Sequence, residues 1–282
     1  MGRNRKLLLL VKKTPVSVGI SLFILFIFLF CAIFASILTP YTPNEQNLKN
    51  IKAKPSQEHL LGTDHLGRDF LTRILHGARI SLFSSVFSCT LGAIVGMFLG
   101  VVAGYSGKML RAIIMRITDA MLSLPPLLLC MVLALVFGGG VLGVGFVIGI
   151  ALMPTYIRVV YSMVLTLRKN DYVTEAKLLG VRKGMILVRH LLPNCFPTVI
   201  VVFTMNLGQA IMIEASLSYL GLGITAPTPA WGSMVSEGYK YIRTNPNLAI
   251  LPGVCVLLIV VAFNLVGDQL RDVLDPRLRG KI

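Results

Sequence analysis

The sequence predicts an all-α, polytopic membrane protein, and three observations lead to this prediction. The chain has 282 residues, a mean hydropathy of +0.78, and only 14% charged residues. Its apolar residues are gathered into blocks of about 20, which is the length an α-helix needs to cross roughly 30 Å of hydrocarbon. Because no water is present there to bond the backbone, apolar blocks of this length are expected to be helical.

Six such blocks predict six transmembrane helices. We expect them at residues 16–38, 80–103, 114–136, 141–161, 196–219 and 248–267. The first block follows a basic N-terminus but is longer than the roughly 7–15-residue apolar core of a signal peptide, so we interpret it as a retained helix. The chain then divides into an N-terminal part with the first span and a long loop (1–79), a five-helix core (80–268) and a short tail (269–282).

Basic charge predicts the orientation of these spans. The net charge is +15, and Lys and Arg are more numerous in the N-terminal segment, the second and fourth loops and the tail than in the other connections. Since basic residues hold loops on the cytoplasmic side, we place both termini in the cytoplasm. This role in topology accounts for the charge, and we expect no nucleic-acid partner.

One predicted span carries a glycine at every fourth position. The four glycines leave a strip of bare backbone, against which another helix can pack closely. We favour ordinary packing within the chain, and the alternative is a seam that lines a pore or faces a partner. The strip consists of Gly92, Gly96, Gly100 and Gly104.

Four polar residues inside the predicted spans are candidates for a translocation path. A carboxylate in hydrocarbon costs several kcal/mol, so it should face protein or water. Asn206, Gln209 and Glu214 fall roughly on one helix face, and Asp119 precedes a Pro-Pro pair. The alternative is hydrogen bonding between helices, or an interfacial position for Glu214. Arg158 is expected to snorkel to the cytoplasm.

No enzymatic motif is found in the sequence. It contains no GxxxxGK[ST] phosphate loop, no HExxH and no nucleophile elbow, so we expect no catalytic residue and no ATP hydrolysis by this chain. The four histidines have no ligand spacing, and the five cysteines fall in or beside apolar blocks as small hydrophobes. We therefore expect no metal site and no cofactor bound by this chain.

The fourth loop, residues 162–195, predicts a compact helix–turn–helix in the cytoplasm. We expect a first helix over 168–179 with Asp171 as a possible N-cap, and Gly180 as the C′ glycine that ends it. A second helix over 181–191 would be stopped by Pro193.

One face of the first loop helix is predicted to receive another surface. Tyr172, Ala176 and Leu179 share that face, and the small Ala176 would let a partner approach closely. The alternative is a solvated basic loop that only sets topology.

This loop resembles the EAA loop of ABC-importer permeases. Gly180 and the pair Leu192-Pro193 match the spacing of that motif, and its triplet aligns with Thr174, Glu175 and Ala176, with Thr174 in place of the usual glutamate. Residues 59–82, 214–234 and 262–280 are similar to the peptide/nickel subfamily, specifically to the C-type subunit of dipeptide and oligopeptide importers.

The resemblance implies a fold, partners and a mechanism. The fold would be that of a type I ABC-importer permease in the cytoplasmic (inner) membrane of a prokaryote. A homologous B-type permease would complete the path, an extracytoplasmic binding protein would deliver substrate, and two ATPase subunits would bind ATP and Mg. The fourth loop would insert into an ATPase through its coupling residues Tyr172, Thr174, Glu175, Ala176, Gly180, Leu192 and Pro193.

Di- or oligopeptides are the expected substrates under this resemblance. Nickel or a metal chelate is the alternative, because the two groups share these motifs. A channel or secondary transporter that works without an ATPase is a third hypothesis, and no convincing internal repeat supports it.

Overall fold

The computed structural model describes residues 16–274, and regular structure in this range is helical apart from one isolated bridge between Thr63 and Asp69. Five helices are long and apolar enough to cross a membrane, and a sixth crossing exists if α4 and α5 are counted as one bent span. The all-α, polytopic prediction is therefore confirmed. The helices are α2 (Val16–Leu38), α3 (Phe70–Tyr105), α4 (Lys108–Leu122), α5 (Pro126–Phe137), α6 (Gly140–Leu167), α7 (Asp171–Leu178), α8 (Lys183–Ile186), α9 (Leu192–Tyr219), α10 (Trp231–Tyr239) and α11 (Asn247–Leu274).

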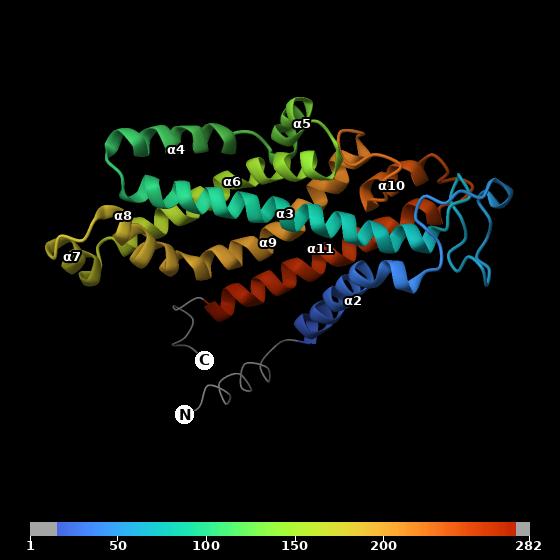
Figure 1. Cartoon of the computed structure of the whole chain (residues 1–282), viewed down its shortest axis with the longest axis horizontal. Coiled ribbons are helices and arrows are strands. Elements are labelled where there is room, and N and C mark those ends of the chain that lie inside the picture. Colours follow the sequence, from blue (N-terminus) through green and yellow to red (C-terminus); the bar gives the residue numbers. More distant parts are fainter. Residues whose placement is uncertain (1–15, 275–282) are drawn as a thin grey trace.

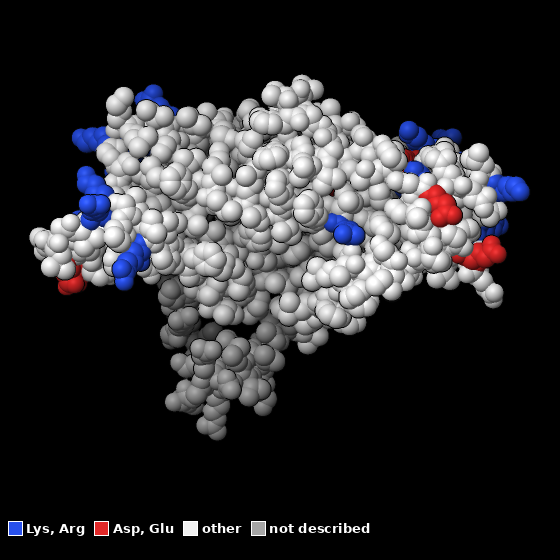
Figure 2. All heavy atoms as spheres, viewed as in Figure 1, with Lys and Arg blue, Asp and Glu red and all other residues white. Residues whose placement is uncertain are grey.

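The molecule is elongated and has two distinct ends (Figure 1). The long helices run along its length, with α7 and α8 at one end and segment 39–69 together with α10 at the other. Lys and Arg gather at both ends, and on the face shown little charge lies between them (Figure 2). An uncharged band between charged ends is the distribution expected of a membrane-spanning bundle.

Helix α3 begins at Phe70 rather than at residue 80, where the apolar block starts. Asp69 is its N-cap, and the carboxylate oxygen Oδ2 accepts a hydrogen bond from the backbone N–H of Thr72 at 2.8 Å. Such a cap satisfies one of the free donors of the first turn. The predicted division between residues 79 and 80 therefore falls inside a helix, because a cap and not hydropathy sets its start.

The predicted third span is broken, and the expectation of one helix over 114–136 is wrong. Helices α4 and α5 meet at an angle of 102°. The break lies at residues 123–125, where proline disfavours helical backbone in the residue before it. Pro126 then occupies the first turn of α5, where its missing N–H costs nothing.

Two apolar clusters hold the bundle together. The larger joins α3, α5, α6 and α9 and extends into the fourth loop, while the smaller joins α2, α3, α9, α10 and α11. The chain's single tryptophan, Trp231, is fully buried in the smaller cluster. Its indole N–H donates to the carbonyl of Ile74 at 3.1 Å, and its ring meets that of Phe28 edge-on at 5.3 Å.

Buried ion pairs fasten segment 39–69 to α10. Arg68 donates through Nε to Asp64 at 2.6 Å and through Nη2 to Glu237 at 3.2 Å. Arg73 approaches the same two carboxylates at 3.4 and 3.6 Å. Two cations and two anions thus share one site, so removing any member would leave a buried charge without compensation.

Candidate coupling loop and translocation face

The first helix of the fourth loop, α7, is shorter than predicted. It covers Asp171–Leu178, its N-cap is Asn170 rather than Asp171, and Arg168 forms the end of α6 instead of the start of the loop helix. The backbone N–H of Val173 bonds to the carbonyl of Asn170 at 3.1 Å. The predicted helix was too long because the backbone N–H groups of the basic residues at its start bond to carbonyls in the last turn of α6.

Gly180 ends α7 with a left-handed backbone, at φ +73°. The N–H of Gly180 bonds to the carbonyl of Lys177 at 3.1 Å, and the N–H of Val181 reaches the carbonyl of Ala176 at 3.0 Å. These two bonds define a Schellman motif, in which glycine adopts positive φ without a steric penalty. The turn between the two arms of the loop thus depends on a residue without Cβ.

Ala176 faces inward, so the prediction that it opens a surface to a partner needs correction. Val173 and Ala176 are buried in the larger apolar cluster beside Ile186 and Leu191. The exposed apolar residues of α7 are instead Leu178 and Leu179, each 82% exposed.

The other predicted coupling residues of α7 lie on its outer side. Thr174 and Glu175 are exposed. The Tyr172 ring lies 6.2 Å from the His190 ring, which belongs to the second arm. Tyr172 therefore contacts the loop's own second arm while remaining partly open to solvent.

The second arm does not stop at Pro193. Helix α8 passes through a π-helical turn, Leu187–Leu191, directly into α9, so that Lys183–Tyr219 forms one apolar stretch of 37 residues. In this turn the N–H of Leu192 bonds to the carbonyl of Leu187, five residues back. The wider turn accommodates Pro193, which has no N–H to donate, so the helix continues where proline would otherwise break it.

The four-glycine strip of α3 lies against α6. A Cβ at Gly92 would stand 2.9 Å from the carbonyl of Gly149, and one at Gly96 would stand 2.6 Å from Cβ of Tyr156. Cβ atoms added at Gly100 and Gly104 would stand 2.8 and 2.6 Å from the Cβ atoms of Val160 and Val164. This chain's own helix therefore occupies the strip, and it is not free to line a pore.

Asn206, Gln209 and Glu214 do not form one stripe, which corrects the prediction. Asn206 and Glu214 are buried, whereas Gln209 is exposed on another side of α9. The Glu214 carboxylate accepts a hydrogen bond from Ser218 Oγ at 2.9 Å, and Ser218 Oγ also accepts from the N–H of Ile224. Glu214 thus organises the end of α9 and the chain that follows it, through a bond within α9 and not the expected bond between helices.

Asp119 forms an ion pair with Arg158, which joins α4 to α6. Both side chains are more than half exposed, although Arg158 lies roughly 14 Å from the end of α6 at 1.5 Å per residue. The predicted snorkelling of Arg158 is therefore replaced by a pairing between helices. Two opposite charges within neighbouring apolar blocks were the sequence signal for it.

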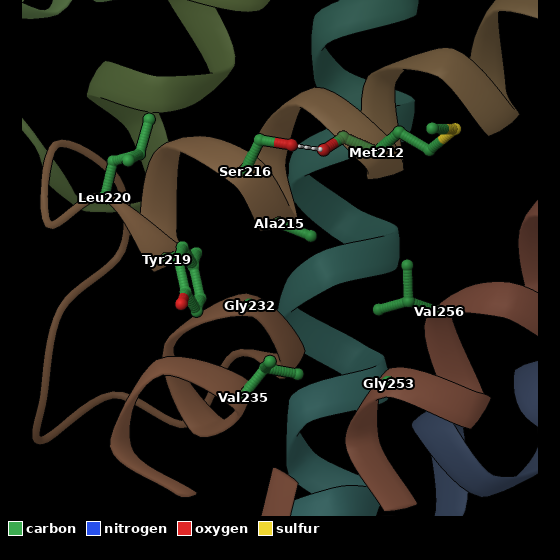
Figure 3. Close-up of a pocket in the computed structure, with 9 residues that line it drawn as sticks. All are labelled: Met212, Ala215, Ser216, Tyr219, Leu220, Gly232, Val235, Gly253 and Val256. Carbon is green, nitrogen blue, oxygen red and sulfur yellow. Dashed lines mark hydrogen bonds between the residues drawn. The ribbon is translucent and has the colours of Figure 1, made fainter. Parts of the chain in front are cut away.

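An apolar pocket of about 460 Å³ lies between α9, α10 and α11 (Figure 3). Its lining residues carry no charge, and the hydroxyl of Ser216 donates to the carbonyl of Met212 at 2.7 Å. The pocket offers little that could hold a polar cofactor.

A three-residue group at the end of the bundle opposite α7 has the composition of a metal site. Asp64, His65 and Glu237 have ligand atoms within 4.8 Å of one another. Arg68 and Arg73 already bind the two carboxylates, and burial lowers the pKa of His65 because desolvation disfavours the imidazolium. His59 is buried in segment 39–69, and its Nδ1 lies 2.9 Å from Oδ1 of Asp69.

These features define a multi-pass membrane transport component with a helical loop that projects from one end of the bundle. The chain belongs to the family described as the binding-protein-dependent transport system inner membrane component, which matches residues 96–280. Residues 18–55 match the N-terminal transmembrane domain of oligopeptide transport permease C. The chain is therefore a permease subunit of an ABC importer, and a channel or secondary transporter that works alone does not fit this family.

Three relatives align over almost the whole chain. The dipeptide transport system permease protein DppC of Alkalihalophilus pseudofirmus is 39% identical, with 95% of this chain and 88% of that protein covered. The di/tripeptide transport system permease protein DppC of Pseudomonas aeruginosa is 40% identical, with 93% and 88% covered. The glutathione transport system permease protein GsiD of Pectobacterium atrosepticum is 39% identical, with 94% and 88% covered.

A solved structure supports the fold. The MetNI methionine ABC transporter, in an inward-facing conformation, contains a chain that aligns with a TM-score of 0.56 and 18% identity. The alignment covers 72% of this chain and 97% of that one. This agrees with the type I importer fold that the motifs imply.

Proposed function

We propose that the chain is the C-type permease of an importer of di- or oligopeptides, or of a small peptide such as glutathione. The observation that carries the proposal is the set of relatives at 39–40% identity over at least 93% of this chain, which are named for dipeptides, di/tripeptides and glutathione. These names favour peptides over the nickel alternative. The chain itself supplies no ATPase machinery, so hydrolysis would occur on separate subunits.

In this proposal the chain works in the cytoplasmic membrane with both termini and α7 in the cytoplasm. A homologous permease completes the path, two ATPases bind ATP and Mg, and a binding protein brings the substrate to the opposite end. The family's description as binding-protein-dependent supports the last of these partners. The excess of basic residues in the α7 loop supports the orientation.

Coupling would proceed through the tip of α7. Leu178 and Leu179 project from a loop whose inner side is fixed by Val173 and Ala176. Two adjacent leucines, each 82% exposed, are apolar surface that a partner can remove from water. A shift of the bound ATPase would then reach the membrane through the continuous helix that follows the loop.

The translocation path would border the face that carries Asp119, Arg158 and the break between α4 and α5. An exposed ion pair is costly in lipid, and irregular backbone is tolerated at membrane depth only beside protein or water. Residues 123–125 are exposed and interrupt the helix close to the ion pair. Gln209 stays a candidate for the path on α9, whereas the burial of Asn206 and Glu214 argues against them.

Reconstitution of the full complex in vesicles tests this function. ATP-driven uptake of a labelled dipeptide that depends on the binding protein, and that excess nickel does not inhibit, is the expected result. Competition by nickel with no peptide uptake would instead assign the machine to metal import.

Leucine variants test the coupling surface. Leu178→Ala combined with Leu179→Ala should lower ATP-driven uptake at least tenfold and release the ATPases on purification. Leu60→Ala removes a similarly exposed side chain, 65% exposed, at the opposite end and should change neither property. Normal uptake by the double variant would refute the assignment.

A further inference from the structure

A basic pocket lies where the transmembrane helices meet the α7 loop. It has a volume of about 520 Å³ and receives side chains from the end of α3, the end of α6, α7, the turn after it and α8. Four of its lining residues are basic and three are apolar or aromatic. They are Arg168, Lys169, Lys177 and Lys183, with Tyr105, Val181 and Ile186.

The four cations of this pocket have no acidic partner in the part of the chain that the structure describes. The ion pairs found within residues 16–274 involve other arginines and a histidine. Arg168 uses one of its N–H groups to bind the carbonyl of Gly104 at 3.2 Å, and its remaining donors stay available. Four like charges around one hollow repel one another, so an anion bound there would be stabilised.

Lys177 points back toward the membrane helices. Its Nζ lies 5.5 Å from the centroid of the Tyr105 ring, at the last residue of α3. Leu178 and Leu179, which follow it in α7, are instead largely exposed. The loop therefore has an apolar tip for a soluble partner and a separate basic side that faces the end of a transmembrane helix.

An apolar track on α3, exposed at Ile94 and Phe98, lies on the helix face that ends at Tyr105 of the pocket. Ile94 and Phe98 are 60% and 61% exposed, and together with Tyr105 they recur at helical spacing on one face. Tyrosine is typical of the level at which a membrane helix leaves the hydrocarbon. Val101, which lies between Phe98 and Tyr105 on this face, is buried, and Tyr105 lines the pocket with the four basic side chains.

We propose that this pocket binds the headgroup phosphate of an anionic phospholipid, with one acyl chain along Ile94 and Phe98. Basic pockets at the ends of transmembrane helices recognise such headgroups by charge and by hydrogen bonds to phosphate. A free phosphate would make no use of the apolar track, and an acidic side chain of an ATPase would have to reach past the exposed tip of α7. The bound lipid would brace α7 against α3 and α6.

Native mass spectrometry of the assembled transporter tests the proposal. The complex would be taken from nanodiscs of phosphatidylcholine with phosphatidylglycerol, and retained phosphatidylglycerol molecules would be counted. Lys177→Gln with Lys183→Gln should retain one phosphatidylglycerol fewer per copy of this chain. The control, Arg182→Gln with Arg189→Gln, removes two charges from the same loop outside the pocket and should retain the parental number.

A second variant guards against a trivial charge effect. Phe98→Ser keeps every basic residue and interrupts the apolar track, so it should also lose the retained lipid. Inorganic phosphate at millimolar concentration should not displace the lipid from the parent complex.

Three results would overturn the proposal. An unchanged lipid count in the Lys177/Lys183 variant would show that the pocket holds no lipid. Loss of ATPase subunits from that variant at an unchanged lipid count would assign the pocket to an acidic protein partner. Displacement by inorganic phosphate alone would assign it to a free anion.

Discussion

Adding a single methyl group at Gly96 should loosen the contact between α3 and α6. Its new Cβ would stand 2.6 Å from Cβ of Tyr156 and 2.9 Å from the carbonyl oxygen of Met153. Both atoms are fixed to the backbone of α6, so neither can swing aside as the end of a flexible side chain would. Overpacking of this kind typically costs about 1–3 kcal/mol.

Gly19→Ala in α2 is the matched control for Gly96→Ala. A Cβ there meets nothing within 4 Å, so alanine should be neutral or stabilising by up to about 1 kcal/mol through its helix propensity. Both changes add one methyl group to a glycine in a transmembrane helix. Only the room available to the new atom differs.

The assay is thermal unfolding of the purified complex in detergent. A cost of about 2 kcal/mol should lower the midpoint by roughly 4–8 °C, at the 2–4 °C per kcal/mol typical of chains of this size. Since α6 leads into the proposed coupling loop, uptake per ATP hydrolysed should fall as well. Equal midpoints for Gly96→Ala and Gly19→Ala would refute the close-packing argument.

Three further changes probe the loop and the polar residues of the spans. Gly180→Ala places a Cβ at φ +73°, which costs about 1–2 kcal/mol, and it should reduce peptide uptake per ATP. The control Gly184→Ala, with open space around its Cβ, should not reduce uptake. Equal loss of uptake in both variants would contradict the role of the turn. Asp119→Asn should lower uptake about tenfold in a fully assembled complex, because it leaves Arg158 unpaired. The double variant that exchanges the two charges, Asp119→Arg with Arg158→Asp, should recover uptake. An inactive double variant would argue against simple pairing. Glu214→Gln should keep uptake and change stability by less than about 1 kcal/mol, since the amide oxygen can still accept from Ser218; loss of uptake at normal stability would return this residue to the path.

Hydropathy was sufficient to predict which parts of the chain cross the membrane, because burial in lipid depends on apolar length. Helix α2 matches its predicted bounds, four other predicted spans each correspond to one long apolar helix, and the third is the bent pair of α4 and α5. The start of α3 and the break before Pro126 were missed because they depend on a cap and on proline geometry inside apolar sequence. Such local effects do not change the mean hydropathy of a window.

The sequence was enough to predict the turn of the candidate loop, but not which side of α7 is buried. Gly180 could be assigned from type and spacing, because few residues other than glycine adopt positive φ. The inward side of Ala176 could not, since on a short helix the buried face is chosen by what packs beneath it. The pairing of Asp119 with Arg158 likewise depends on how α4 lies beside α6, which no spacing along the chain specifies.

The unbroken helix from Lys183 to Tyr219 sets a mechanical scale for transport. Its 37 residues measure about 55 Å, so a tilt of about 5° at one end displaces the other by roughly 5 Å. The π-helical turn at Leu187–Leu191 lies near the end that an ATPase would push, with the long arm beyond it. Small strokes would thus be magnified along the helix. A hinge inserted there at an exposed position, such as Val188→Gly, should dissipate them without removing a buried side chain.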